Sequence, residues 1–510
     1  MNRFLRVSAL CACAALCAAL CGCVPSGGET SEPSPTATAA VETTVVTTAA
    51  TTTTSPLPAT PALCYDKSDS LSPYEATTRV NRALAPLMFE GLTAVSADYT
   101  ATLCLAEKIE KTDATHLTVT LKKGLKFSEN SAVKAADVAA SFRLAARSET
   151  YAALVADVAS VTAKNDRTLA VTLERAVPFY EAELSFPVVK TVKKRTVGTG
   201  LYRLDTKKTG LEKNPYNKTA VNIDRFELED VTRRQQQQFA LETGTVCVYT
   251  DDLANGTAPR TVTGVTRTPV TMPYLVFLGF NANRAPWSSA ALRGSLSYAV
   301  SRTEVAAAGF SGFAVPTATP FCPAWGALKD VTGASLSEER AKAVAVWKKN
   351  GYNVSENGKV KNRLSAELIC RKDNAMHKAT ANELATQLKA AGMQVSVKPL
   401  SESEYAARLS SGNYDLYVGE VRLPNTLSLD AVLTGSGGAA YGISAGGYAL
   451  WTQYKSGKLT TQEFVTAFYK ETPFLPLCYA QGLTLTSPRL AGIRPSGVSA
   501  FDGVEQWIFT

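Results

Sequence analysis

The chain has 510 residues, 45% of them hydrophobic and 19% charged, with a formal net charge of +8. This length suits two or three packed units, and the composition is typical of a globular protein. Because basic residues gather only in short groups such as Lys193–Arg195, the positive charge indicates a solvated surface and no nucleic-acid partner.

The N-terminus is typical of an exported protein. Asn2–Arg6 is positively charged, and the apolar stretch Val7–Leu20 is too short to span a bilayer but suits a secretory signal. The sequence Leu20-Cys21-Gly22-Cys23 resembles a bacterial lipobox, in which a small residue precedes the cut and a thiol carries diacylglycerol. We therefore expect a signal peptide over residues 1–22 and a lipid on Cys23. The alternative is an ordinary signal followed by a chance cysteine.

Residues 23–61 are predicted to be a disordered tether that begins at the lipidated cysteine. Thr, Ala, Ser and Pro dominate this stretch, and it has almost no large apolar side chains apart from a few valines and Leu57. Such a composition cannot bury enough apolar surface to fold. Folding is expected to start near Ala62, so the tether would lift the folded body off the membrane.

Six cysteines follow the predicted lipid anchor, and they are widely scattered. There is no CxxC motif and no zinc-like spacing, so we expect no metal site and no cofactor. Outside the cytosol these thiols could form disulfides, but six cysteines allow 15 pairings. The sequence leaves the pairing open among Cys64, Cys104, Cys247, Cys322, Cys370 and Cys478.

The first half of the folded region mixes helices with alternating strands. Within residues 71–92, apolar side chains recur at helical spacing up to Gly91. Strict alternation of apolar and polar residues predicts strands at Leu117–Leu121 and Leu169–Leu173. A helix of small apolar residues is expected to begin within Lys134–Ser141.

A strand–turn–helix unit opens the second half. Tyr274–Phe280 consists of apolar, small and aromatic residues, which predicts a strand buried on both faces. Asn281–Pro286 has the composition of a turn. Either Ser288 or Ser289 can then cap a helix that Gly309 ends.

Strands and helices alternate beyond this unit. A helical stripe within Glu338–Tyr352 is followed by a β-α-β-α-β pattern, which argues for a three-layer α/β lobe with right-handed crossovers. The expected elements are a strand at 366–370, a helix at 380–391, a strand at 394–398, a helix at 403–409 and a strand at 414–418.

Several segments resemble those of the extracellular solute-binding proteins of family 5, the oligopeptide and dipeptide receptors of ABC importers. The family's FN, Pro and RxxLxYAxxR pattern is matched at Phe280, Asn281, Pro286, Arg293, Leu296, Tyr298, Ala299 and Arg302. Further matches to the family's YEGL, TAEDVxFS and PVGTGPY segments stand at Phe89–Leu92, Lys134–Ser141 and Val197–Tyr202. The resemblance runs from about Leu71 to the C-terminus in the family's order.

This resemblance implies an α/β fold of the two-lobed, periplasmic-binding-protein-like type II, with mixed sheets, an inserted subdomain and a ligand cleft between the lobes. The first lobe is expected to be assembled from residues 62–88, 194–270 and 480–510, and the subdomain to be inserted at 89–193. Residues 271–479 are expected to form the second lobe.

The same resemblance implies a substrate-binding lipoprotein of an ABC importer, and not an enzyme. A monomer on the extracytoplasmic face of the cell membrane would capture short peptides and deliver them to permease and ATPase subunits. A receptor for another small solute, an oligosaccharide or a metal chelate, is the alternative within the binding class. A surface-anchored sensor or interaction protein that keeps the fold without a permease is the alternative outside transport.

Short enzyme-like motifs are present but out of context. Ser131-x-x-Lys134 and Lys208-Thr209-Gly210 match two motifs of penicillin-recognising serine enzymes, yet the third motif stands in the wrong order. Gly435-x-Gly437-x-x-Ala440 lacks the βαβ unit of a dinucleotide site. The only histidines, His116 and His377, are both predicted on the surface, which weakens a nickel-receptor interpretation.

The candidate ligand anchors follow the last predicted strand. A short-peptide receptor needs a carboxylate for the amine, a cation for the carboxylate end and main-chain edges that pair with the peptide. The family's GWxxDY run, which holds its amine-binding Asp, is missing after Tyr414-Asp415-Leu416, and Glu420 and Arg422 stand in its place. Strand alternation puts both on one face, so both could point into the cleft. An exposed pair at a strand end is the alternative.

Aromatic side chains near these anchors are candidates for an apolar ligand subsite. A large ring can line such a subsite, but ordinary core packing is the alternative for each of them. The candidates are Tyr274, Tyr417, Tyr441 and Trp451.

Overall fold

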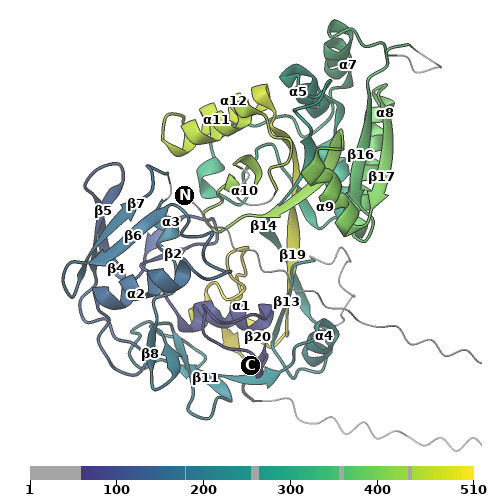
Figure 1. Cartoon of the computed structure of the whole chain (residues 1–510). Helices are drawn as coiled ribbons and strands as arrows, with labels where there is room; N and C mark the ends of the chain where they lie inside the picture. The colour runs from purple at the N-terminus through teal and green to yellow at the C-terminus, as the bar shows by residue number, and fades with distance from the viewer. Residues whose placement is uncertain (1–58, 179, 254–263, 355–360, 435–438) are drawn as a thin grey trace, which may run out of the picture. The chain divides into compact units, whose positions relative to one another are not determined.

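The computed structural model describes residues 59–178, 180–253, 264–354, 361–434 and 439–510 (Figure 1). The predicted signal peptide, the lipidation site Cys23 and nearly all of the predicted tether lie outside these ranges, as do Gly435 and Gly437 of the dinucleotide-like motif. Among the described residues, none of the helices combines the length and the apolar character needed to cross a membrane.

Helices and strands are interleaved along the described chain. The α-helices are α1 (Arg79–Met88), α2 (Ala135–Ala145), α3 (Tyr180–Glu183), α4 (Arg234–Glu242), α5 (Ala290–Ala299), α6 (Arg302–Phe310), α7 (Arg340–Lys349), α8 (Ala375–Ala390), α9 (Glu402–Ser411), α10 (Asp430–Leu433), α11 (Ala445–Lys455) and α12 (Thr461–Glu471). The strands of the first half are β1 (Ala62–Tyr65), β2 (Thr93–Val95), β3 (Ala101–Leu103), β4 (Ala106–Lys111), β5 (His116–Leu121), β6 (Val158–Ala163), β7 (Thr168–Leu173), β8 (Lys190–Val192), β9 (Arg195–Val197), β10 (Tyr202–Leu204), β11 (Gly210–Lys213), β12 (Arg225–Asp230) and β13 (Val248–Asp251). Those of the second half are β14 (Thr266–Phe280), β15 (Ala314–Pro316), β16 (Ser365–Arg371), β17 (Gln394–Leu400), β18 (Leu416–Arg422), β19 (Phe474–Thr486), β20 (Leu490–Ala491) and β21 (Ile508–Phe509).

One part of the molecule is built on a four-stranded antiparallel sheet in the order β4-β5-β7-β6. Apolar residues of β5 and β7 are buried while the residues between them are partly exposed, so both predicted alternating strands are confirmed. Helix α2 packs on this sheet, and the shared core runs from Leu92 to Val188. We call this part the small-sheet subdomain.

A larger, eleven-stranded sheet has the order β10-β11-β12-β1-β13-β19-β14-β18-β16-β17, with β15 paired to β19. It is mixed: β1 runs parallel to β12 and β13, and β16 runs parallel to β17 and β18. The neighbours in its middle, from β13 to β18, are antiparallel. The predicted mixed α/β fold is therefore present, while the lobe boundaries given above remain predictions.

Strands β14 and β19 lie side by side in the middle of this sheet, although about 200 residues separate them in sequence. Their pairing is interrupted by a bulge between Thr271 and Leu275. Every residue of β14 from Leu275 to Phe280 is buried, as its composition predicted. In Figure 1 the two strands connect the region of β13 and α1 with the region of β16 and α8.

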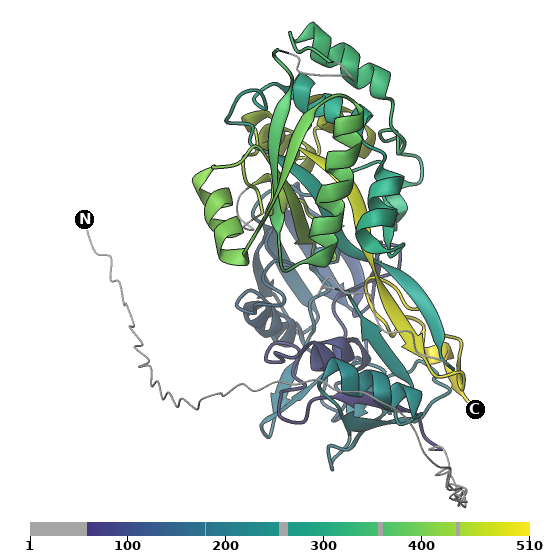
Figure 2. The same ribbon diagram turned by 90° about the vertical axis from the view of Figure 1, so that its right-hand side faces the viewer.

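The predicted β-α-β-α-β unit is confirmed as β16-α8-β17-α9-β18, with β16 between its two parallel neighbours. Leu384 and Leu388 of α8 pack against Leu368 of β16 in one core. Figure 2 brings this green part of the chain to the front, with its helices beside the strands. We call the part that contains β16 to β18 and α5 to α12 the C-terminal lobe.

Two boundaries of this unit differ from the sequence-based expectation. Helix α8 begins at Ala375 and not near residue 380, because the Asn374 side chain caps its first turn. Strand β18 continues through Arg422 because its whole length pairs with β14. Glu420 and Arg422 are therefore inside a strand and not beyond its end.

The predicted single helix ending at Gly309 is wrong in its length. Ser289 caps α5, as expected, by accepting a hydrogen bond from a backbone N–H of the first turn. The backbone at Val300 and Ser301 is extended, and the Ser301 side chain caps a second helix, α6, in the same way. The chain therefore turns between two helices where one was predicted.

The six cysteines after the predicted lipid anchor are all free thiols in the structure. Cys104 is partly exposed and the other five are buried. Burial raises the pKa of Cys370 and Cys322 to about 11, so these thiols stay protonated at neutral pH.

Two arginines of the family-like segment are buried and bonded to backbone carbonyls. Arg302 is 0% exposed and donates to the carbonyl oxygens of Pro476 at 2.9 Å and Ser335 at 2.6 Å. Arg293 is 1% exposed and donates to the carbonyl oxygen of Thr472 at 2.9 Å. These bonds join the helix pair α5–α6 to the segment that leads into β19.

Replacing Arg302 by Met should lower the free energy of unfolding by about 3 kcal/mol, because two buried carbonyl oxygens lose their donors. Urea denaturation followed by circular dichroism measures the change. Arg340→Met is the matched control, since the Arg340 side chain is 45% exposed; its loss should cost less than about 0.5 kcal/mol. Equal losses in both variants would contradict the role given to Arg302.

Candidate ligand site

Glu420 on β18 is surrounded by groups that stabilise its negative charge. One carboxylate oxygen lies 2.9 Å from Nε2 of His377 on α8, and the other lies 3.8 Å from the guanidinium of Arg371 at the end of β16. Tyr274 on β14 adds a hydrogen bond between the side chains. Burial alone would raise the pKa of Glu420, but these contacts hold it below its usual value of 4.5. The group is therefore an anion at neutral pH.

The prediction that His377 lies on the surface is wrong. The residue is 1% exposed and lies in the first turn of α8. Because Asn374 starts the helix earlier than expected, the imidazole falls on the inner side of the helix, against Glu420. Among the described residues, neither ring nitrogen has a well-aligned hydrogen-bond partner, despite the 2.9 Å contact. His116 is exposed beside Asp113, as predicted.

Arg422 lies two residues further along β18, on the same face as Glu420, as alternation predicted. The two side chains do not pair with each other. A guanidinium nitrogen of Arg422 lies 3.7 Å from Asp252, which follows β13, and Asp252 also forms a 3.0 Å ion pair with Arg79 at the start of α1. Tyr274 is directly opposite Arg422 in the β14–β18 ladder. Arg422 therefore lies where the C-terminal lobe meets β13 and α1.

The remaining predicted aromatic residues lie on the other face of β18. Tyr417 and Trp451 are 1% and 3% exposed. They share a core with the partly buried Tyr441, and alternation places Tyr417 opposite to the Glu420 face. The structure therefore brings Tyr274, Glu420 and Arg422 together. The other three predicted site residues, Tyr417, Tyr441 and Trp451, lie apart from them.

Sequence reasoning missed Arg371, His377, Asp252 and Arg79 as members of this cluster. One signal was available for the first of them. β16 and β18 are parallel, so their carboxyl ends meet at one edge of the sheet, and Arg371 ends β16 as Arg422 ends β18. The other three come from elements whose neighbourhood the sequence does not show.

The structure has two cavities that do not contain the predicted anchors. One, of about 230 Å³, shares Arg79 and Asp252 with the cluster and also has Asp251 in its wall. The other, of about 790 Å³, is lined by residues between Tyr65 and Glu212. Neither wall contains Glu420 or Arg422.

The enzyme-like SxxK motif is not assembled as a catalytic pair. The Ser131 hydroxyl accepts a hydrogen bond from Lys190 at 3.0 Å. The ammonium of Lys134 instead lies 3.1 Å from Asp166. The two groups of the motif therefore have different partners. Within the described ranges, no group of three or more His, Cys, Asp and Glu side chains is arranged to hold a metal ion.

The sequence pattern of the bacterial extracellular solute-binding proteins, family 5 (middle), matches residues 100–455. The chain belongs to this family. It is therefore an extracytoplasmic substrate-binding component of an ABC transporter, and it is not an enzyme.

Comparisons with individual proteins agree with this assignment. The chain is 26% identical to the dipeptide-binding protein of Lactococcus lactis subsp. cremoris over 454 residues, 75% of this chain and 77% of the relative. The unliganded open form of the periplasmic murein tripeptide-binding protein MppA has a TM-score of 0.72 at 18% identity, covering 89% of this chain and 98% of MppA. NikA from Brucella suis, in complex with Fe(III)-EDTA, gives a TM-score of 0.65 at 17% identity, covering 88% and 100% of the two chains. These structures share the predicted periplasmic-binding-protein fold.

The charge of Glu420 should make part of the stability depend on pH. Because its pKa is lowered in the folded state, its stabilising contribution is present above its usual pKa of 4.5 and is lost as the pH falls through the lowered value. The difference in unfolding free energy between the native protein and Glu420→Gln should therefore shrink as the pH falls from 4.5 through the lowered pKa. Urea titrations across this range measure it. Glu402→Gln, at a side chain that is 72% exposed, is the control; a constant difference for Glu420→Gln would contradict the assignment.

Proposed function

We propose that this protein captures short peptides and delivers them unaltered to the permease of an ABC importer. Glu420 would bind the α-amine of the peptide, and Arg422 its carboxylate end. The observation that carries the proposal is the presence of these two opposite charges on one face of β18, each with its own counter-ion. A short peptide presents the same two charges, and charge-assisted hydrogen bonds to both ends are strong.

The contacts of Arg422 suit a group that exchanges its partner. Its side chain is 58% exposed, and its contact with Asp252 is long, at 3.7 Å. An exposed, loosely paired ion contact contributes little stability, so a ligand carboxylate can replace it at small cost. Glu420 is more buried, at 20% exposure of its side chain, and His377 lies 2.9 Å from its carboxylate.

The names of two similar proteins support a peptide ligand. The Lactococcus lactis relative is a dipeptide-binding protein, and MppA is a murein tripeptide-binding protein. Each is similar to this chain over three quarters of its length or more. The two predicted lobes would close on the ligand, since a ligand favours the closed state by its contacts with both sides.

Glu420→Ala combined with Arg422→Ala should weaken peptide binding roughly 100- to 1,000-fold, because two charge-assisted contacts are lost. Isothermal titration with a panel of di- to pentapeptides measures this, after mass spectrometry of any ligand released from the purified, unheated protein. Glu338→Ala with Arg340→Ala is the matched control, an exposed ion pair with the same two-residue spacing. Unchanged affinity in the Glu420/Arg422 double variant would reject these anchors.

The roles of the two proposed anchors should also be distinguishable with peptides that have one end blocked. Glu420→Gln should bind an N-acetylated peptide as well as the native protein does. It should lose affinity only for peptides whose α-amine is free. Arg422→Met should show the same behaviour toward a C-terminally amidated peptide. Equal losses for blocked and free peptides would show that these side chains do not contact the ends.

A metal chelate is the second candidate ligand, and one observation favours it. The imidazole of His377 is buried 2.9 Å from Glu420, and imidazole is a common metal ligand. NikA of Brucella suis is seen with Fe(III)-EDTA. Binding of Fe(III)-EDTA or Ni(II)–histidine, with no response to any peptide of the panel, would replace the peptide proposal.

We further propose that the protein is held at the membrane by a lipid on Cys23. Cys23→Ala should remove the acyl chain and move the protein from the membrane pellet to the soluble extracytoplasmic fraction. Fractionation with radiolabelled palmitate measures both effects. Cys21→Ala is the control, since a lipobox cut after Gly22 leaves Cys21 in the removed peptide. A Cys23→Ala protein that remains labelled and membrane-bound would contradict the anchor.

A further inference from the structure

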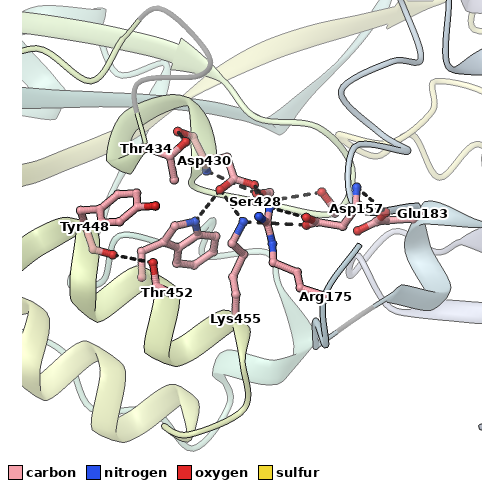
Figure 3. A network of polar contacts seen from close by, with 11 residues as sticks. Asp157, Arg175, Glu183, Ser428, Asp430, Thr434, Tyr448, Thr452 and Lys455 are labelled. Carbon is pink, nitrogen blue, oxygen red and sulfur yellow. Dashed lines mark hydrogen bonds and ion pairs between the residues drawn. The ribbon is translucent and has the colours of Figure 1, made fainter. Parts of the chain in front are cut away.

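A cluster of charged side chains, two of them buried, joins the small-sheet subdomain to the C-terminal lobe (Figure 3). Asp157 and Lys455 are only 5% and 6% exposed. Asp157 precedes β6 in the subdomain, whereas Lys455 ends α11 in the lobe. Buried ions are costly unless they are paired, so their arrangement is informative.

Each part of the molecule contributes one tight ion pair. In the C-terminal lobe, the ammonium of Lys455 lies 2.6 Å from Asp430, which also accepts a 2.8 Å hydrogen bond from the indole N–H of Trp451. In the subdomain, the guanidinium of Arg175 forms an ion pair with Asp157. Both pairs are complete without the other part.

The contacts between the two parts are longer. Lys455 lies 3.9 Å from Asp157, and Arg175 lies 3.9 Å from Asp430. The four groups thus form a closed ring in which negative and positive charges alternate, tight within each part and loose between the parts. Figure 3 shows Arg175 and Lys455 side by side between the two aspartates.

This arrangement is suited to repeated opening. When the parts separate, the ring divides into two intact pairs, and no charge is left without a partner. Removing one member of a buried pair is far more costly than separating two complete pairs that become hydrated. The attraction across the gap is modest, because each cross contact is near the 4 Å limit of an ion pair.

We propose that the ring of Asp157, Arg175, Asp430 and Lys455 is a reversible latch that holds the small-sheet subdomain against the C-terminal lobe in the absence of ligand. The proposal rests on the opening and closing of the proposed binding function, but not on the identity of its ligand. The latch sets how often the ligand-free protein is open.

Glu183 of α3 makes this latch sensitive to pH. It is 6% exposed, and one carboxylate oxygen accepts a 3.2 Å hydrogen bond from the backbone N–H of Asp157. Burial, and then the charge of Asp157, raise the pKa of Glu183 to about 8. The charges of Lys455 and Asp430, from the lobe, act on Glu183, and Arg175 is the ion-pair partner of the neighbouring Asp157. Strands β2 and β3, which also pack on α3, have no titratable side chains.

The charge of the cluster depends on this proton. With Glu183 protonated, two carboxylates face two cations; with Glu183 ionised, a third negative charge is added beside Asp157. The proposal requires that opening hydrates Glu183 and so lowers its pKa; the closed state then holds the proton more tightly. The closed state is therefore favoured most below the pKa that Glu183 has when hydrated, and it loses population as the pH rises from there through about 8.

Small-angle X-ray scattering of the ligand-free full-length protein tests the latch, with mass spectrometry confirming that no ligand is bound. Lys455→Met keeps the apolar stem and removes the charge, and it should lower the closed-to-open ratio roughly fivefold and enlarge the radius of gyration. Lys458→Met, three residues further along at an exposed lysine, is the matched control and should leave the scattering unchanged. Unchanged scattering for Lys455→Met, with native circular dichroism, would overturn the proposal.

A double-mutant cycle shows whether the contact between the parts is responsible. Asp157→Asn and Lys455→Met should not have additive effects on the closed-to-open ratio, because each removes the same contact. Additive effects would overturn the latch. If Lys455→Met does not fold, a cycle of Arg175→Met with Asp430→Asn replaces this one, since these two side chains form the other 3.9 Å contact between the parts and Arg175 is 52% exposed.

The role of Glu183 is tested by the same scattering at pH 6.5 and 9.5. The native protein should open at the higher pH, and Glu183→Gln should remain closed at both. An identical pH response in the two proteins would overturn the role of Glu183. Peptide titration of the native protein in the same buffers tests the proposed function separately, so failure of one proposal is distinguishable from failure of the other.

Discussion

The antiparallel pairing of β14 with β19 is the interaction on which the rest of the structure depends. β13 attaches to one edge of this pair and β18 to the other, so without it the large sheet would separate into two halves. The pair is stabilised by burial as well as by its ladder, because Leu275–Phe280 and most of β19 are inaccessible to solvent. The bulge between Thr271 and Leu275 contains Tyr274, so the strand that connects the halves also supplies a residue of the candidate site.

The buried arginines explain why the family-like segment identifies the fold but not the ligand. Arg293 and Arg302 bind main-chain carbonyls near the start of β19, and their function there is structural. The charged residues of the candidate site come instead from the ends of β13, β16 and β18. Recognition of the family and recognition of the ligand therefore depend on different residues.

Charged groups between the parts of this molecule follow one pattern at two places. At Asp252, the contact with Arg79 is short and the contact with Arg422 is longer. In the ring around Lys455, the contacts within each part are short and those between the parts are 3.9 Å. In the ring, the short contacts keep each charge paired when the long ones break. At Asp252, the group that loses its partner is Arg422, whose side chain is 58% exposed. Neither movement leaves a buried ion alone.

Local patterns in the sequence determined most elements of the fold. The alternation of Leu117–Leu121, the buried strand Tyr274–Phe280 and the β-α-β-α-β unit all depend on residues close in sequence, and the shared face of Glu420 and Arg422 follows from strand geometry alone. Tertiary structure decided what these elements contact. The burial of His377 depends on how α8 packs against β18, and Asp252 approaches Arg422 only because β13 and β18 flank the same central pair. Such contacts join residues that are far apart in the chain, and no local periodicity records them.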